Sequence, residues 1–164
     1  MTVQIRPATA GDRLALWSML EPAFRAGDTY TIDPGVSEDD ALAYWTSSPK
    51  TVFLAETTRP LGTYFLTPNQ GGNGAHVCNC GFVTAADAQG QGVASAMLNH
   101  ALALAPTLGF RAMQFNFVVS TNAGAIRLWH RAGFDTVGRL PAAFRHPAAG
   151  YVDALVMYKT LQEV

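Results

Sequence analysis

Apolar side chains recur along the chain at two spacings, and each spacing predicts a type of secondary structure. A helical face is indicated where apolar residues lie three or four positions apart, as in Leu14, Trp17, Leu20 and Phe24. Short runs of β-branched and aromatic residues are instead typical of strands. These runs predict seven strands, with a loop at Pro141–Gly150 between the last two: Val3–Arg6, Lys50–Glu56, Leu61–Thr67, Ala75–Val83, Ala112–Val119, Phe134–Leu140 and Tyr151–Leu161.

Polar residues and glycines mark the beginnings of four predicted helices. Asp12 suits the N-cap of the first helix, and Ser37 begins a Ser-x-x-Asp capping box that opens the second. The third helix begins after Gly92 and the fourth at Asn122. The order β-α-α-β-β-β-α-β-α-β-β predicts one α/β domain over residues 1–164, with the helices packed on a central sheet.

Composition and charge limit the classes of partner. The 164 residues are 49% hydrophobic and 14% charged, which is typical of a globular domain with a substantial core. The net charge of −1 gives no general attraction to nucleic acid or to an anionic membrane. Residues 1–88 hold five basic and nine acidic side chains, whereas residues 89–164 hold six basic and three acidic ones. An anionic ligand is therefore expected in the second half.

The two cysteines indicate a reducing compartment. Cys78 and Cys80 are too few for a disulfide framework and lie on one face of the same predicted strand. With His76 they form a row of alternate residues, but such residues are about 6.5 Å apart and cannot converge on one zinc ion. We therefore expect no metal. No signal peptide or membrane span is visible, and the expected location is cytoplasmic.

The segment Gln89–Ala94 carries two glycines between a predicted strand and a predicted helix. Free backbone N–H groups and the positive end of the helix dipole can hold phosphate there, although glycine also serves in ordinary turns. A dinucleotide fingerprint is nearly matched by Gly90-x-Gly92-x-x-Ser95, but the preceding strands look like hairpins and no acidic residue follows at the required distance. A Walker loop is excluded because no Gly-Lys-Ser/Thr follows.

Two motifs together resemble the GCN5-related N-acetyltransferase (GNAT) family. Gln89–Ala94 matches its pyrophosphate loop, Gln/Arg-x-x-Gly-x-Gly/Ala, and Asn122–Phe134 is similar to its second signature, Asn-x-x-Ala-x-x-Leu-Tyr-x-x-x-Gly-Phe. The resemblance implies the GNAT fold, a mixed and mostly antiparallel sheet with splayed fourth and fifth strands and four flanking helices. It also implies acetyl-CoA as acetyl donor, with no metal. The residues implied to bind acetyl-CoA are Val83, Thr84, Gln89, Gly90, Gln91, Gly92, Val93, Ala94, Ser95, Asn122, Ala125 and Trp129.

The catalytic groups that the resemblance implies are only partly present. The usual proton donor of the family is the tyrosine of the second signature, where this chain has Trp129, and an indole N–H is not a practical acid. The fourth predicted strand carries no carboxylate, so His76 and Asn79 are its candidate catalytic residues, with His76 as the base. A hydrogen-bonded histidine without a chemical role is the alternative. Glu56 is a further candidate base.

The acyl acceptor is expected between the first two helices and the loop that joins the last two strands. The candidate residues there are Tyr30, Asp33, Arg145 and His146. Asp28 and Asp33 suit either a cationic amine or an ordinary turn.

The predicted activity is acetylation of a primary amine of a small molecule, or of a protein N-terminus or lysine, by direct attack while both substrates are bound. The alternative is a catalytically silent acyl-CoA-binding module of the same fold. A preference for an acyl donor with a chain longer than acetyl, and assembly as a homodimer, also stay open.

Overall fold

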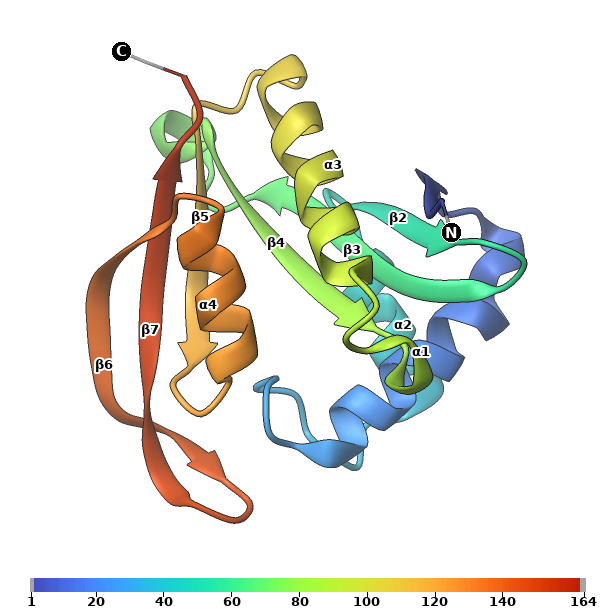
Figure 1. Ribbon diagram of the computed structural model, residues 1–164, viewed down its shortest axis with the longest axis horizontal. Helices are drawn as coiled ribbons and strands as arrows, with labels where there is room; N and C mark the ends of the chain where they lie inside the picture. The colour runs from blue at the N-terminus through green and yellow to red at the C-terminus, as the bar shows by residue number, and fades with distance from the viewer. Residues whose placement is uncertain (1, 163–164) are drawn as a thin grey trace.

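Seven strands form one open, twisted sheet in the computed structural model, which describes residues 2–162 (Figure 1). Their order across the sheet is β1-β2-β3-β4-β5-β7-β6, and neighbours are antiparallel except for the parallel pair β4 and β5. The strands are β1 (Gln4–Pro7), β2 (Thr51–Glu56), β3 (Pro60–Pro68), β4 (Val77–Thr84), β5 (Ala112–Val119), β6 (Asp135–His146) and β7 (Gly150–Thr160).

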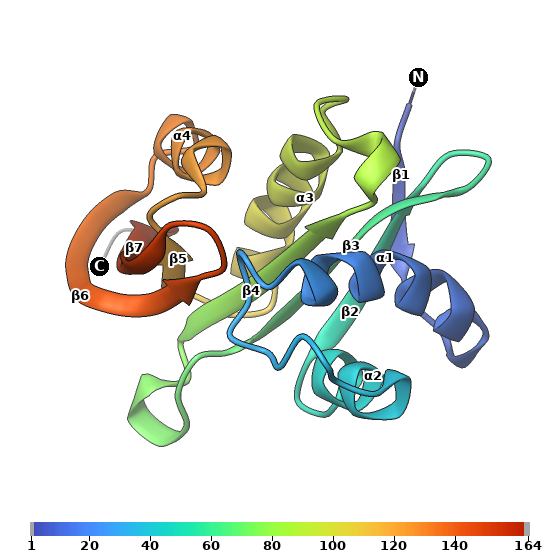
Figure 2. The same ribbon diagram turned by 90° about the horizontal axis from the view of Figure 1, so that it is seen from below.

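The helices cover both faces of the sheet, with α1 and α2 on one side and α3 and α4 on the other (Figure 2). Their bounds are α1 (Arg13–Ala26), α2 (Glu38–Thr46), α3 (Val93–Thr107) and α4 (Ala123–Arg131), and short 3-10 turns occupy Ala10–Asp12, Gly72–Gly74 and Ala86–Ala88. This arrangement confirms the predicted α/β fold with four flanking helices. Ser37 caps α2 as predicted, because its hydroxyl accepts a hydrogen bond from the Asp40 N–H at 3.1 Å.

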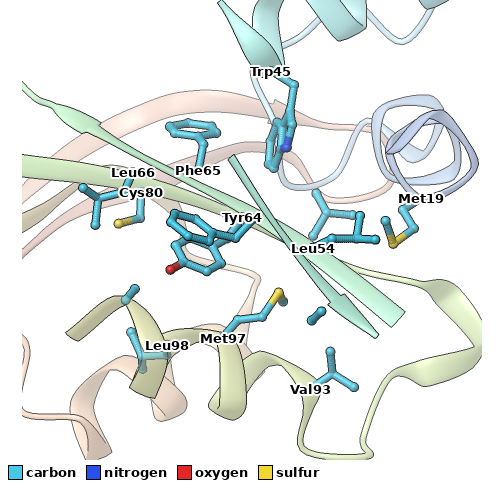
Figure 3. Close-up of a cluster of buried hydrophobic side chains, with 14 of the residues drawn as sticks. Met19, Trp45, Leu54, Tyr64, Phe65, Leu66, Cys80, Val93, Met97 and Leu98 are labelled. Atoms are coloured by element: carbon cyan, nitrogen blue, oxygen red, sulfur yellow. The ribbon is translucent and has the colours of Figure 1, made fainter. Parts of the chain in front are cut away.

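Alternate residues of β3 supply the core on the two faces of the sheet (Figure 3). Phe65 packs against Trp45 of α2, with ring centroids 4.8 Å apart, and the neighbouring Tyr64 contacts His100 of α3. Tyr64 and Phe65 are both buried. The predicted apolar face of α1 is wrong at Leu14, whose side chain is 77% exposed. The helix buries Leu16, two residues further along, in its place.

Strands β4 and β5 separate after a short paired segment. The only partners in their described register are Val77 with Ala112 and Cys78 with Met113. Beyond Cys78 the two strands diverge, and the gap between them opens the sheet from one face to the other. The splay of the fourth and fifth strands that the family resemblance implied is therefore confirmed.

The last hairpin is longer than the sequence analysis predicted. β6 continues to His146 and β7 begins at Gly150, so most of the expected Pro141–Gly150 loop is strand. The register shifts between Leu140 and Phe144. Proline lacks a backbone N–H, but it is tolerated at a bulge of an edge strand, which is where Pro141 lies.

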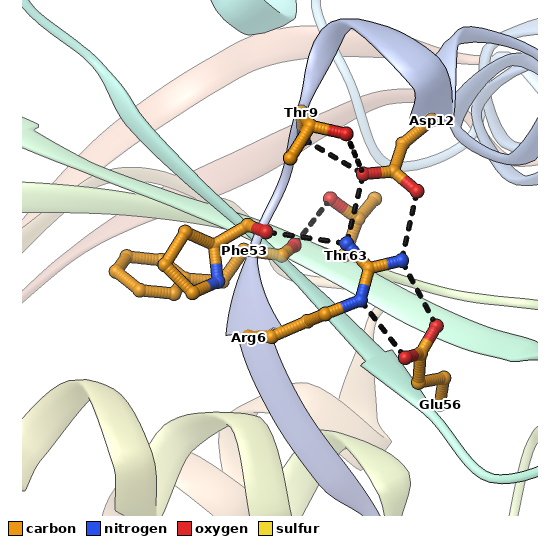
Figure 4. Close-up of polar contacts among 7 residues, drawn as sticks. Arg6, Thr9, Asp12, Phe53, Glu56 and Thr63 are labelled. Carbon is orange, nitrogen blue, oxygen red and sulfur yellow. Dashed lines mark hydrogen bonds and ion pairs between the residues drawn. The ribbon is translucent and has the colours of Figure 1, made fainter.

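A charged cluster joins the N-terminal strand to the start of α1 (Figure 4). The Arg6 guanidinium contacts Asp12 and Glu56, each at 2.8 Å. Asp12 occupies the N-cap position of α1, as predicted, but its carboxylate accepts from the Thr9 N–H at 2.7 Å rather than from the helix. The hydrogen bonds from Arg6 hold the pKa of the Asp12 carboxyl well below its usual range.

An Asp12→Asn variant is expected to melt about 2–4 °C below the wild type near pH 7. A depressed carboxyl pKa stabilises the folded state above the unfolded pKa of about 4, and this stabilisation is lost as the pH falls. The difference in melting temperature should therefore shrink below about pH 4. Asp39→Asn is the control, because Asp39 also pairs with an arginine but its side chain is 86% exposed. Equal effects of the two variants at every pH would contradict this role of Asp12.

Candidate functional site

A cavity of about 910 Å³ lies where β4 and β5 diverge. Its walls come from the loop after α1, from α2, β3, β4 and β5, from the start of α3 and from α4. It is therefore lined by elements from both faces of the sheet. A pocket of this size at an opening in a sheet is a common place for a ligand.

The backbone of β4 presents groups to this gap that do not pair with a neighbouring strand. The Asn69 N–H donates to the Val77 carbonyl and the Ala85 N–H donates to the Leu61 carbonyl, each at 2.8 Å, and the β3–β4 register between them is unbroken. In an antiparallel pair, successive residues direct their N–H and C=O groups to opposite sides. The odd-numbered residues of β4 therefore pair with β3, and Phe82 and Thr84 face β5.

Val83 lines the cavity, but its backbone pairs with Thr63 of β3 and so faces away from the gap. The backbone of Phe82 faces the gap instead. The sequence carries no sign of this difference, because the phase of a strand's hydrogen bonds is set by its partner strand. Thr84 does face the gap. Tyr30 lines the cavity as expected, and its hydroxyl donates to the Phe82 carbonyl at 2.7 Å. Burial raises the pKa of Tyr30, which keeps this donor protonated.

The glycine loop lies beside the same gap, at the start of α3. Gly90 and Gly92 have φ values of 74° and 81°, and no atom lies within 4 Å of the position that a Cβ would take at either residue. The N–H groups at the first turn of α3 have no partner within the helix. Of the predicted loop residues, Gln89, Gly90, Gly92, Val93, Ala94 and Ser95 line the cavity, whereas the Gln91 side chain donates to the Asp87 carbonyl at 2.9 Å.

Helix α4 closes the other side of the cavity. Asn122, Ala125 and Trp129 all line it, as predicted. The Asn122 side chain caps the helix by accepting from the Ala125 N–H at 3.3 Å. Trp129 packs on Phe82 and Phe115, with ring centroids 5.3 and 4.5 Å apart, and its indole N–H has no hydrogen-bond partner among the described residues.

Arg131 is the one charged side chain among the described residues that line the cavity. The sequence offers no signal for it, because a basic residue in the last turn of a helix is commonly explained by the helix dipole. Its presence is consistent with the expectation of an anionic ligand in the second half of the chain.

Aromatic, amide and hydroxyl side chains form the wall of the cavity on the α2 face of the sheet. We call it the α2 wall, and it comprises Thr31, Tyr44, Phe65, Asn79 and Asn116. Phe65 lies across β4 at Gly81, where a Cβ would be 2.5 Å from the Phe65 ring. Glycine is therefore required at this position for the ring to lie flat over the strand.

Asn79 bridges the two strands just beyond their last backbone pair. Its Nδ2 donates to the Gln114 carbonyl at 2.9 Å. A carbonyl can only accept, so this bond fixes which end of the amide points to β5 and leaves Oδ1 as an acceptor. A second bridge joins Asn116 to Asn69, whose Oδ1 accepts from the Asn116 Nδ2 at 2.6 Å. Both bridges hold the α2 wall where the backbone ladder has ended.

The two candidate bases, His76 and Glu56, lie elsewhere. His76 precedes β4, is exposed, and accepts through its carbonyl from the Arg111 N–H at the paired end of the two strands. It is not among the residues that line the cavity. Glu56 is held by Arg6 at the far edge of the sheet. The geometry therefore supports neither as the base.

Three of the expected acceptor residues also lie outside the lining of the cavity. The Asp33 carboxylate accepts from the Gly35 N–H at 2.7 Å, as a turn residue does. Arg145 is exposed at the end of β6, and the His146 ring accepts from the N–H groups of Ala148 and Ala149 in the hairpin turn. The side chains of Asp33 and His146 thus have local structural roles.

The cysteines belong to the core. Cys78 and Cys80 are buried free thiols, and burial raises the pKa of the Cys80 thiol. Within residues 2–162 no group of three or more histidine, cysteine, aspartate or glutamate side chains could hold a metal ion. No described helix is both long enough and apolar enough to cross a membrane.

Comparison with known proteins identifies relatives over most of the chain. Residues 14–134 match the acetyltransferase (GNAT) family. The N-acetyltransferase aca1 of Schizosaccharomyces pombe is 37% identical over 100 residues, which make up 60% of this chain and 48% of that protein. The matched segment thus spans about half the length of this relative.

Solved structures share the fold over nearly the whole chain. A GCN5-related N-acetyltransferase from Kribbella flavida has 36% sequence identity and a TM-score of 0.92, covering 96% of this chain and 97% of that one. A phosphinothricin acetyltransferase from Sinorhizobium meliloti, solved in complex with acetyl-CoA, has 19% identity and a TM-score of 0.86, covering 99% of this chain and 90% of that one. At that identity the second likeness shows a shared fold.

Proposed function

This chain belongs to the acetyltransferase (GNAT) family, and we propose that it transfers the acetyl group of acetyl-CoA to an amine. The observation that carries the proposal is the gap between β4 and β5, which joins a free strand edge and an open glycine loop to the α2 wall.

The residues around the gap fit acetyl-CoA. The backbone groups of Phe82 and Thr84 can pair with the amides of the pantetheine arm, as an added strand would. The N–H groups of Gly90–Ser95 and the start of α3 suit the diphosphate, and a Cβ at Gly90 or Gly92 would stand in otherwise open space. Arg131 adds the positive charge that phosphate groups require. The acetyl-CoA complex of the relative from Sinorhizobium meliloti supports this assignment.

Acetyl-CoA supplies an activated acyl group, and the chain supplies orientation. We assign Asn79 to the acceptor amine, because its free Oδ1 can accept an amine N–H and aim the nitrogen lone pair at the acetyl carbon. The nitrogen–carbon bond forms as the carbon–sulfur bond breaks. The products are the acetylated amine and the CoA thiol.

Proton transfer in this site is assigned to water. The described lining contains no carboxylate and no histidine. Burial raises the pKa of Tyr30, of Tyr44 and of Cys80, so these groups stay protonated and do not act as bases at neutral pH. Water therefore takes the amine proton and returns one to the thiolate. Trp129 shapes the cavity and excludes bulk solvent without donating a proton.

An Asn79→Ala variant tests the proposed acceptor contact. We expect kcat/KM for the amine to fall about tenfold, the typical effect of losing one hydrogen bond, while the Kd for acetyl-CoA measured by calorimetry stays unchanged. Gln114→Ala is the control, because it leaves the backbone carbonyl that accepts from Asn79. Full activity of Asn79→Ala would remove Asn79 from the site, and equal losses in both variants would assign the effect to the packing of β5.

A further inference from the structure

Lys50 lies between α2 and β2, and its ammonium contacts the α2 wall on the side that faces away from the main cavity. Its Nζ is 4.5 Å from the ring centroid of Tyr44 and 5.2 Å from that of Phe65. It donates to the Tyr44 carbonyl at 2.6 Å. Lys50 lines a separate cavity of about 530 Å³, whereas Tyr44 and Phe65 line the main one. The two rings thus separate the ammonium from the proposed acceptor site.

In the part of the chain that the structure describes, Lys50 has no carboxylate partner. Of the acidic residues of α2, Glu38 and Asp39 contact an arginine of α1. The third, Asp40, accepts a hydrogen bond from the Ser37 hydroxyl at 2.9 Å. Burial lowers the pKa of Lys50 from its usual value, which agrees with an ammonium that lacks a carboxylate partner. The α2 wall therefore has a positive group behind it and no carboxylate in front.

We propose that the acceptor is a monoamine, a compound whose accepting nitrogen is its sole cationic centre, and that Lys50 sets this specificity. The inference rests on the proposed acetyltransferase function. A diamine or polyamine would bring a second ammonium to a wall that provides no carboxylate for it, within the field of Lys50. Aromatic rings can attract a cation, but the Lys50 ammonium already lies against both rings and would repel a second cation on their other side.

Matched pairs of amines measure the effect of the second charge. Butylamine is compared with 1,4-diaminobutane, and benzylamine with 4-(aminomethyl)benzylamine, by the kcat/KM for acetylation at neutral pH. We expect each monoamine to exceed its diamine about tenfold, which is the scale of repulsion between like charges some 8–10 Å apart near a protein surface. Added salt should weaken the discrimination only partly, because the site is partly shielded from solvent.

Variants of Lys50 and Thr31 test whether the Lys50 charge causes the preference for monoamines. Lys50→Met keeps the apolar stem and removes the charge, so the ratio of kcat/KM between monoamine and diamine should fall to about threefold or less. Lys50→Arg keeps the charge and should preserve that ratio. Thr31→Asp adds a carboxylate at an exposed position of the α2 wall and should also narrow the ratio, without disturbing the core. Agreement of these independent changes would support the proposal even if Lys50→Met lost stability.

The outcomes separate this inference from the proposed function. If monoamines and diamines are acetylated equally well by the wild type, the function stands and the specificity is overturned. A wild-type preference that persists unchanged in a folded Lys50→Met variant would overturn the role of Lys50. If no amine is acetylated although calorimetry shows that acetyl-CoA binds, the proposed function fails and this inference fails with it.

Discussion

A Gly92→Asp variant should bind CoA at least about 100-fold more weakly than the wild type in calorimetry. Gly92 has a φ of 81° and forms the N-cap of α3, at the centre of the proposed diphosphate cradle. An aspartate there would put a side chain and a negative charge where the diphosphate is expected. Two like charges in contact cost far more than the loss of one hydrogen bond.

The control for this variant is Gly109→Asp at the other end of the same helix. Gly109 has a φ of 89° and also has no atom within 4 Å of a Cβ position. Both substitutions therefore impose a similar backbone strain and add the same charge. Because the helix dipole disfavours a negative charge at the C-terminus of α3, Gly109→Asp should lower the melting temperature at least as much as Gly92→Asp. Only Gly92→Asp should lose CoA. Unchanged affinity of Gly92→Asp would remove the glycine loop from the site.

The second large effect is expected for Trp129→Ala. Trp129 is 7% exposed and its ring contacts Phe82 and Phe115, so its removal should cost about 3–5 kcal/mol of folding free energy and leave a hole beside the proposed thioester position. We expect kcat to fall by at least about tenfold even below the melting transition, because Phe82 supplies a backbone contact to the proposed cofactor arm.

A Trp129→Phe variant separates packing from proton donation. Phenylalanine keeps an aromatic ring against Phe115 but has no N–H, so a packing role predicts a kcat within about threefold of the wild type. A stable Trp129→Phe protein that is as inactive as Trp129→Ala would show that the indole N–H takes part in the reaction. The comparison is made by steady-state kinetics, with thermal unfolding as the control for folding.

Local signals predicted the elements well because their causes are local. The positions of Ser37 and Gly92 mark helix starts through hydrogen bonds and backbone angles that neighbouring residues determine. The glycine loop was visible for the same reason. Pro141 misled the prediction, because its effect depends on whether its strand lies at an edge of the sheet, and only the strand order shows that β6 does.

The acceptor side was harder to predict because distant residues form it. His76 was selected as a strand residue, but β4 begins one residue later and the side chain lies outside the cavity lining. Lys50 gave no signal, since its importance comes from a contact with Phe65 that only the folded chain creates. Asn79 was selected for its polarity alone, and the orientation of its amide follows from a carbonyl 35 residues away.

Acetyl transfer is tested most directly by incubating the purified protein with acetyl-CoA and a set of amines and detecting the products by mass spectrometry. The set includes small monoamines and a peptide with a free N-terminus and a lysine. We expect an acetylated amine and free CoA in equal amounts, and we expect both to form only when the protein is present. Binding of acetyl-CoA without either product would contradict this expectation, and would indicate an acyl-CoA-binding module that does not catalyse transfer.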